Sequence, residues 1–148
     1  VFIQDFYVMF LLFFFLAFVL YSFNCSIKRR YEKFIKQHIY KEMTANMCDK
    51  VMRERNINPI KTQKCKKINT FIKADDRTVK SICVSEGEPY GDMTKSRQGF
   101  DVVVCNWKTA KATKCHYVGK KLKNKKIIIK CLKGYPVHYN ETLPILSD

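Results

Sequence analysis

The chain has 148 residues, which excludes a large multidomain protein and leaves room for one folded domain. It carries 28 Lys and Arg residues against 13 Asp and Glu residues, a formal net charge of +15. Few neutral enzymes have such a surplus. It favours a polyanionic partner, either nucleic acid, a glycosaminoglycan or an anionic membrane, and charge alone does not rank these three.

Residues 6–23 form an apolar run without a charged side chain. A run of this length lies between the core of a signal peptide and a membrane-spanning helix. If it stayed in the membrane, the basic residues 28–30 would hold the rest of the chain in the cytosol. The cysteine content argues for secretion. We therefore expect residues 1–25 to be a cleaved signal peptide, incomplete at its N-terminus because the sequence lacks an initial Met, and residues 26–148 to be the mature domain.

Six of the seven cysteines lie in the expected mature domain, and Cys25 lies at the expected cleavage point. An even count in a small secreted domain predicts three disulfides, and spacing alone leaves fifteen pairings open. A zinc site is disfavoured because no C-x-x-C pair occurs and the histidines are scattered. No metal and no other cofactor is expected. Loss of Asp5 with the signal raises the mature charge to about +16.

The first half of the mature domain has helical patterns. Residues 29–41 carry apolar side chains at helical spacing, and His38 shares or borders that buried stripe. A second helix is expected over residues 45–55, ended by a turn at Asn58-Pro59. The aspartates at 75 and 76 offer an N-cap for a third, short helix.

The second half is rich in β-type segments. Residues 68–72 are the first expected strand, whereas residues 85–99, with three glycines and one proline, are expected to form a loop. Further strands are predicted over residues 100–107, 114–120, 125–132 and 137–139, with a hairpin loop over residues 119–125. Helices followed by an antiparallel sheet predict an α+β domain.

Three histidines could supply acid–base chemistry, although any one of them would ordinarily be a surface or satisfied core residue. His38 is expected on the inward side of the first helix, and His138 lies in the last expected strand after Pro136 and Val137. In one cleft they would provide the base and the acid that phosphodiester cleavage requires. His116 has no comparable context and is expected to be structural. The reaction also needs a fixed cation, but the lysines are too numerous for composition to identify it.

One segment carries a family resemblance: Cys65, Lys66, Asn69, Thr70 and Phe71 match the C-K-x-x-N-T-F signature of the pancreatic ribonuclease (RNase A) superfamily. The pairs Lys33-Phe34 and Gln37-His38 upstream, and Pro136-Val137-His138 downstream, resemble that family's other two active-site segments in the same order. The resemblance covers residues 31–141. It implies a fold in which short N-terminal helices pack on a curved, mostly antiparallel sheet with three disulfides.

The resemblance implies a metal-independent endoribonuclease that cleaves single-stranded RNA 3′ of pyrimidines. The implied base for the 2′-hydroxyl proton is His38, the acid for the departing 5′-oxygen is His138, and Lys66 would stabilise the transition state. The product would be a 2′,3′-cyclic phosphate, hydrolysed more slowly. Four substrate-binding residues are implied: Gln37, Lys33, Asn69 and Thr70. Gln37 would help to hold the phosphate, Asn69 would be a hydrogen-bonding neighbour of the cleft, and Thr70 would read the pyrimidine.

The resemblance also implies the disulfides Cys48–Cys105, Cys65–Cys115 and Cys83–Cys131. The fourth bridge of the pancreatic enzymes is missing, because residues 85–97 contain no cysteine, and the segment of residues 132–137 is shorter than in those enzymes. Both departures resemble the angiogenin-like branch and the secreted ribonucleases of non-mammalian vertebrates.

Two other departures concern activity. Asn140 stands where the family usually has an aspartate that orients the acid histidine, so a modest loss of rate is expected. Lys133 lies near the implied second-base subsite, where an acidic residue is common. Arg53 and Arg55 lie where angiogenins carry a basic cluster, but Glu54 interrupts it, so nuclear targeting is not inferred.

The stretch K-K-L-K-N-K-K at residues 120–126 has two interpretations. It is either a solvated hairpin tip or a polyanion patch that extends RNA binding or contacts anionic cell surfaces and glycosaminoglycans. Three functional hypotheses follow: a secreted endoribonuclease, a cationic antimicrobial protein that needs no catalysis, and an angiogenin-like secreted signal. In each case the mature protein is expected to be extracellular, monomeric and not membrane-spanning.

Overall fold

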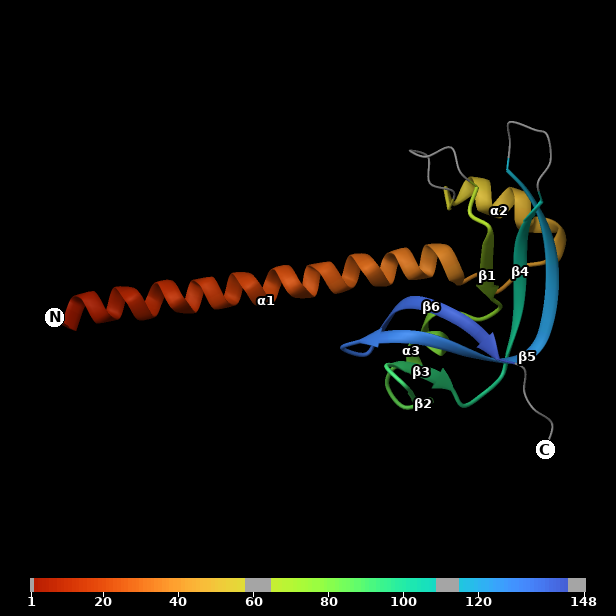
Figure 1. The fold of residues 1–148 in the computed structure, drawn as a ribbon. Coiled ribbons are helices and arrows are strands. Elements are labelled where there is room, and N and C mark those ends of the chain that lie inside the picture. The colour runs from red at the N-terminus through yellow and green to blue at the C-terminus, as the bar shows by residue number, and fades with distance from the viewer. Residues whose placement is uncertain (1, 58–64, 109–114, 144–148) are drawn as a thin grey trace.

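The structure, a computed structural model, describes residues 2–57, 65–108 and 115–143. Its elements in chain order are α1 (Phe2–His38), η1 (Ala45–Met47), α2 (Cys48–Glu54), β1 (Ile68–Ile72), α3 (Asp76–Ser81), β2 (Gly87–Tyr90), β3 (Met93–Ser96), β4 (Phe100–Lys108), β5 (His116–Leu132) and β6 (Tyr135–Leu143). The paired strands are antiparallel, which confirms the α+β class (Figure 1). The turn expected at residues 58–59 lies outside the described residues.

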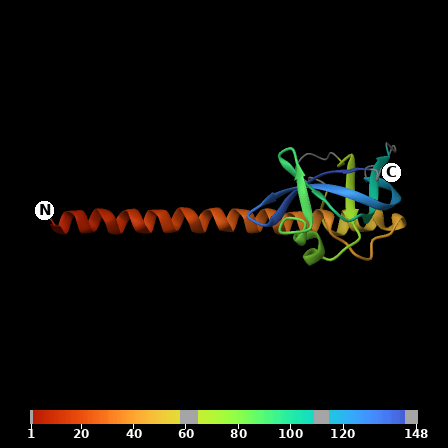
Figure 2. The same ribbon diagram turned by 90° about the horizontal axis from the view of Figure 1, so that it is seen from below.

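The first helix is much longer than expected. It has 37 residues and a length of about 55 Å, because no proline or glycine separates the apolar run from the helix that follows. Its apolar part projects away from the body, as Figures 1 and 2 show, and could cross a membrane by length and composition. Ile27, 4% exposed, is the first buried side chain in its described part. Residues 4–26 of the helix are all exposed.

The end of α1 is set by a tertiary contact. The helix was expected to reach Lys41 but ends at His38. Ile39 instead forms a parallel bridge with Ile72 of β1, and the Tyr40 N–H donates to the Ile72 carbonyl at 3.0 Å. The helix therefore stops where β1 offers its backbone a competing partner, although the local sequence contains no stop signal.

The two short helices follow the sequence more closely. The helix expected over residues 45–55 begins as the 3₁₀ turn η1 and continues as α2, which buries Cys48, Val51 and Met52 as expected. The carboxylate of Asp75 accepts a hydrogen bond from the Thr78 N–H at 2.8 Å, which confirms the predicted N-cap of α3.

The sheet is organised around β5, a single strand of 17 residues. Residues 116–125 of β5 pair with β4, whereas residues 126–132 pair with β6. The path of paired strands is β1-β4-β5-β3-β2, and β6 also pairs with β5. Because the strand bends between its halves (Figure 1), the sheet has two arms that share one strand.

The prediction of a hairpin loop over residues 119–125 is wrong, since these residues belong to β5. Gly119 is needed because η1 packs on it: an added Cβ would lie 2.1 Å from the Ala45 carbonyl oxygen. Asn124, at φ 51°, lies at the bulge where β5 changes partners, and its N–H donates to the Asp101 carboxylate at 3.1 Å. These two residues therefore mark a close backbone approach and a bulge, and not a turn.

The prediction of a loop over residues 85–99 is also wrong, because these residues include the hairpin of β2 and β3. Pro89 is tolerated because β2 is an edge strand. A second tight hairpin joins β5 to β6 through Lys133 and Gly134, whose φ angles of 46° and 77° are typical of a type I′ turn.

The two faces of the arm formed by β1 and β4 bury different core clusters. Ile72 and Val102 face the cluster that contains Phe34, whereas Phe71 and Val103 face the cluster of α2. Three disulfides join the elements, Cys48–Cys105, Cys65–Cys115 and Cys83–Cys131, and these are the pairings that the family resemblance implies. Cys25 is exposed and unbonded to another cysteine.

Replacement of Gly119 by Ala is expected to lower the free energy of unfolding by about 1–3 kcal/mol, because the methyl group would displace the backbone of η1. Val118→Ala is the matched control, since the Val118 side chain is 39% exposed and its removal leaves η1 in place. Denaturant unfolding of the oxidised proteins measures both changes. Equal stability of Gly119→Ala and wild type would contradict the close approach.

Candidate active site

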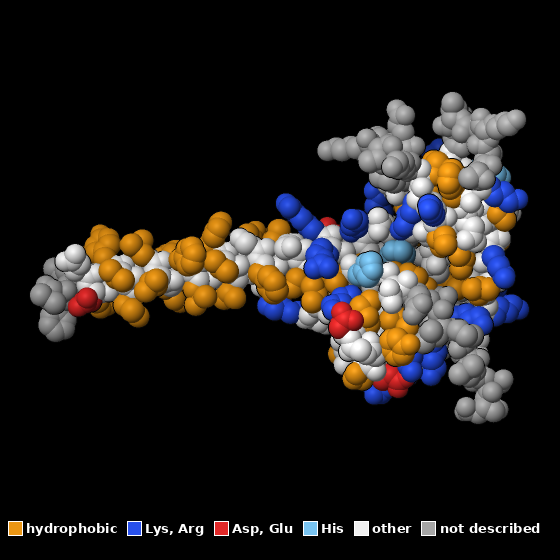
Figure 3. Space-filling model, in the orientation of Figure 1, with side chains coloured by type: hydrophobic (Ala, Val, Ile, Leu, Met, Phe, Trp, Pro, Cys, Tyr) orange, Lys and Arg blue, Asp and Glu red, His pale blue; other side chains and the backbone are white. Residues whose placement is uncertain are grey.

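One surface pocket of about 220 Å³ lies between the last turns of α1 and β6. Its lining residues are Arg30, Lys33, Phe34, Gln37, His38, Val137 and His138. Two histidine surfaces lie together where α1 meets the body, with Lys and Arg side chains around them (Figure 3). The pocket thus brings together four of the predicted site residues: Lys33, Gln37, His38 and His138.

The hydrogen bond of His38 determines its chemistry. Its Nδ1 lies 2.9 Å from the Thr70 carbonyl oxygen, which can only accept, so Nδ1 must carry the proton. The neutral ring then has its lone pair on Nε2, at the opposite side of the ring. The bond therefore holds His38 in the tautomer in which Nε2 is a base.

Burial keeps His38 neutral. Its ring is 8% exposed, stacks on the Tyr139 ring with centroids 5.0 Å apart, and contacts Phe34 at 5.4 Å. This desolvation, supported by the nearby charges of Lys66 and His138, lowers the His38 pKa from 6.5 to about 4 despite the hydrogen bond to Thr70, which raises it. His38 is therefore unprotonated at neutral pH.

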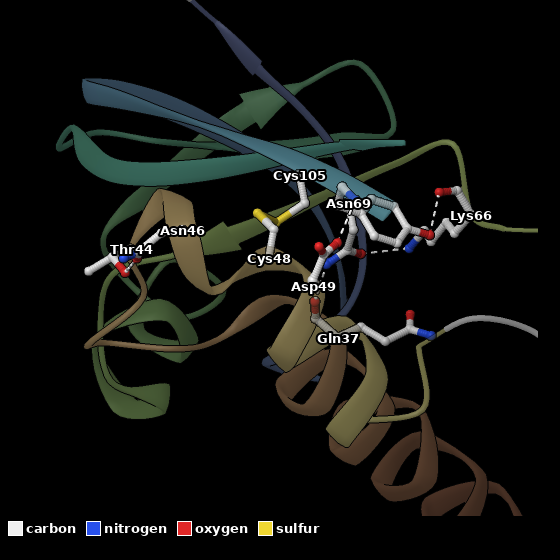
Figure 4. Close-up of a disulfide and its surroundings, with 9 residues drawn as sticks. Gln37, Thr44, Asn46, Cys48, Asp49, Lys66, Asn69 and Cys105 are labelled. Carbon is white, nitrogen blue, oxygen red and sulfur yellow. Dashed lines mark hydrogen bonds between the residues drawn. A yellow bond between two sulfur atoms is a disulfide. The ribbon is translucent and has the colours of Figure 1, made fainter. Parts of the chain in front are cut away.

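Asn69 connects the third predicted catalytic residue to the helix. The Lys66 ammonium donates to Asn69 Oδ1 at 2.7 Å, and Asn69 Nδ2 donates to the Gln37 carbonyl at 2.8 Å (Figure 4). Asn69 is 2% exposed, and both bonds are partly buried. The Tyr117 hydroxyl donates to the Lys66 carbonyl at 2.8 Å and fixes the backbone of the same residue. Lys66 is thereby held beside the helix turn that carries His38.

The pocket is strongly cationic. Partial burial lowers the pKa of Lys66, and the neighbouring charge of Lys33 lowers it further. Lys33 and Arg30 line the pocket, whereas Lys66 is not among its lining residues. Like charges that repel one another in this way are stabilised when an anion enters, so the arrangement favours a phosphate.

Thr70 positions the His38 ring through its backbone and lies in the strand next to it. Its carbonyl holds His38, and the residue itself is 7% exposed in β1, paired with Val104 of β4. Phe71 points to the opposite face and is fully buried, as expected for a core residue. The signature segment therefore presents alternate residues to the site and to the core.

Arg55 has a function at the end of α1 that its sequence context does not predict. Its guanidinium donates to the Lys36 carbonyl at 3.1 Å and the Ile39 carbonyl at 2.7 Å, and it lies 4.5 Å from the Tyr40 ring centroid. Carbonyls at a helix C-terminus need such partners, and a cation there also opposes the helix dipole. Arg55 thus fixes one carbonyl in the last turn of α1 and the carbonyl of the residue that follows His38. Because α2 and α1 are separate in the sequence, only their packing reveals this contact.

Three other predicted positions have different surroundings. His116 pairs with Asp49 at 2.5 Å and joins β5 to α2, away from the pocket lining, in agreement with a structural role. Asn140 is exposed on β6, two residues after His138. The Lys133 ammonium lies 4.7 Å from the Phe23 ring centroid.

Comparison with known proteins identifies the family. The chain matches the family model described as pancreatic ribonuclease over residues 29–140, so it belongs to the pancreatic ribonuclease family. It is a ribonuclease of the angiogenin-like branch of the RNase A superfamily.

Similar proteins include Ribonuclease-like 3 of Danio rerio, 35% identical over 126 residues that cover 82% of this chain and 84% of the relative. Angiogenin of Saguinus oedipus is 36% identical over 122 residues, 77% of this chain and 79% of the relative. The X-ray structure of zebrafish RNase5 matches with a TM-score of 0.73 at 35% identity and covers 78% of this chain and 96% of that one.

Arg55→Ala is expected to destabilise the fold by about 1–3 kcal/mol, because two carbonyls at the end of α1 lose their charged donor. The turnover number should also fall, since the His38 backbone is no longer held. Arg53→Ala, an exposed arginine on the same helix, is the control and should match wild type. Thermal unfolding and RNA cleavage rates measure the two effects, and indistinguishable variants would contradict the capping role.

Stability should fall as the pH is lowered from about 6.5 to about 4. The unfolded chain binds a proton at His38 in this range while the fold does not, since the folded pKa is about 4, so protonation favours unfolding. The loss from this group reaches about 3 kcal/mol. His38→Gln, which cannot titrate, should show a shallower pH dependence than wild type. Unfolding at several pH values measures this. Parallel curves for wild type and His38→Gln would contradict burial of a neutral ring.

Proposed function

We propose that the chain cleaves single-stranded RNA on the 3′ side of pyrimidines by transphosphorylation. The observation that carries the proposal is the His38 Nδ1 bond to the Thr70 carbonyl, which leaves Nε2 basic in a pocket that His138 also lines. A base and an acid in one cationic pocket are what attack by a 2′-hydroxyl on its own phosphodiester requires.

In the first step, His38 Nε2 takes the proton of the 2′-hydroxyl, and the 2′-oxygen attacks phosphorus. His138, protonated at the start, gives its proton to the departing 5′-oxygen as the P–O5′ bond breaks. The product is a 2′,3′-cyclic phosphate. Water then opens the ring with the two roles exchanged, which returns both histidines to their starting states.

The other site residues would bind and stabilise charge. Lys66, held by Asn69, would stabilise the extra negative charge on the phosphorane oxygens. Gln37 and Lys33, which line the pocket, would hold the phosphate. Thr70 would pair with the pyrimidine through its backbone N–H and hydroxyl. Because these groups supply the base, the acid and the cation, the proposed mechanism uses no metal.

We further propose that the protein is secreted, with residues 1–25 as the signal peptide. The apolar run is exposed on α1, Ile27 is already part of the folded body, and three disulfides suit an oxidising compartment. The extracellular role would be host defence or an angiogenin-like signal, exerted by a monomer. Exposed lysines on β5, Lys120, Lys121 and Lys123, support the alternative of a polyanion-binding antimicrobial protein whose action does not need catalysis.

The oxidised domain of residues 26–148 should cleave uridylyl-3′,5′-adenosine in the presence of EDTA. His38→Ala and His138→Ala should each lower kcat by about 10²–10⁴, because each removes one proton-transfer group. His116→Ala is the control histidine and should retain the wild-type rate. Cleavage that requires a metal, or equal rates for wild type and His38→Ala, would overturn the mechanism. Bactericidal action that survives both catalytic substitutions would favour the polyanion-binding alternative.

A further inference from the structure

A row of three side chains crosses the sheet beside the proposed base-binding residue. Thr70 of β1 pairs with Val104 of β4, and Val104 pairs in turn with Lys120 of β5. Directly paired residues on neighbouring strands present their side chains on the same face of a sheet. Thr70, Val104 and Lys120 therefore lie side by side on one face.

Core packing identifies that face as the one that holds the active site. Residues two positions away on each strand, Ile72, Val102 and Leu122, share the face, because side chains alternate along a strand. All three pack in the cluster that contains Phe34 and Tyr139, the two rings against His38. Lys121 alternates to the other face, where its partner Val103 belongs to the second cluster.

The next row outward leaves this surface open. It consists of Ile68, Asn106 and Val118, which are paired across the same three strands. The outer two side chains are 57% and 39% exposed, so an apolar surface beside Thr70 is available to a flat ring. A base that contacts Thr70 can thus lie on this face, with Lys120 at the far end of its row.

The row contains one charged group, and that group is a cation. Val104 has no hydrogen-bonding side-chain atom, so it cannot orient the Thr70 hydroxyl. The exposed Lys120 has a flexible four-carbon stem that can extend over Val104 towards Thr70, which is about 10 Å away between Cα atoms across two strand spacings. Its ammonium offers three donors and no acceptor.

The sign of that charge distinguishes the two pyrimidines. A threonine hydroxyl can donate to N3 of cytosine, which has a lone pair, or accept from N3–H of uracil. A cation beside the hydroxyl oxygen attracts its lone pairs and turns its hydrogen towards the base. We propose that Lys120 is a specificity-determining residue that biases the base bound at Thr70 to cytosine over uracil. The inference rests on the proposed pyrimidine-specific cleavage.

The test compares cleavage of cytidylyl-3′,5′-adenosine and uridylyl-3′,5′-adenosine by the oxidised domain. Wild type should show the higher kcat/KM with the cytidine substrate. In Lys120→Gln the cytidine-to-uridine ratio of kcat/KM should fall about threefold to fivefold, the size expected for one solvent-exposed charge, and Lys120→Glu should lower it further. The difference between variants should shrink at high salt. Because both substrates are measured on one preparation, the ratio does not depend on the folded fraction.

Lys121→Gln is the matched control, since it removes the same charge from the adjacent position on the other face. A ratio unchanged in Lys120→Gln, an equal fall in Lys121→Gln, or a wild-type preference for uridine would overturn the role of Lys120 and leave the ribonuclease mechanism intact. Wild type as inactive as His38→Ala on both substrates would overturn the proposed function itself.

Discussion

The hydrogen bond between His38 Nδ1 and the Thr70 carbonyl joins the two halves of the molecule that make the site. It attaches the last turn of α1 to β1, fixes the tautomer of the ring and buries it against Tyr139. The helix end is held on both sides of this bond. Asn69 binds the Gln37 carbonyl, and Arg55 binds the carbonyl of Ile39. The carbonyls on either side of the histidine thus have side-chain partners from β1 and from Arg55, the residue that follows α2.

The site combines features that oppose one another energetically. The buried His38 lies in a pocket with the cations Lys33 and Arg30, and the partly buried Lys66 carries a further charge close to it. Burial lowers the pKa values of His38 and Lys66. The charges of Lys66 and His138 lower that of His38 further, and the charge of Lys33 lowers that of Lys66. Such an arrangement costs stability in the free protein, whereas a bound phosphate relieves the repulsion. Part of the binding energy of an RNA backbone is therefore expected to come from removing this strain between charges.

The long strand β5 connects the candidate active site to the lysine-rich residues 120–126. Its second half pairs with β6, which carries His138, and its first half pairs with β4, which lies beside Thr70. The bulge at Asn124 allows one strand to serve both arms. The lysines of residues 120–126, which the sequence allowed to be a hairpin tip, therefore lie along a strand. The two faces of that strand have different neighbours. Lys120 shares a face of the sheet with Thr70, and Lys121 pairs with Asp101 at 3.2 Å.

The sequence by itself determined the α+β class, the inward position of His38, the N-cap at Asp75 and, through the C-K-x-x-N-T-F signature, the family. The signature also led to the proposal that Lys66 is the catalytic cation. Each follows from local spacing or from residue identity. Three features depended on tertiary structure: the stop of α1 at His38, the continuity of β5 through Gly119, and the contact of Arg55 with the helix end. The physical reason is the same in all three. A backbone group or a small residue is placed by a partner far away in the sequence, and local propensity contains no information about that partner.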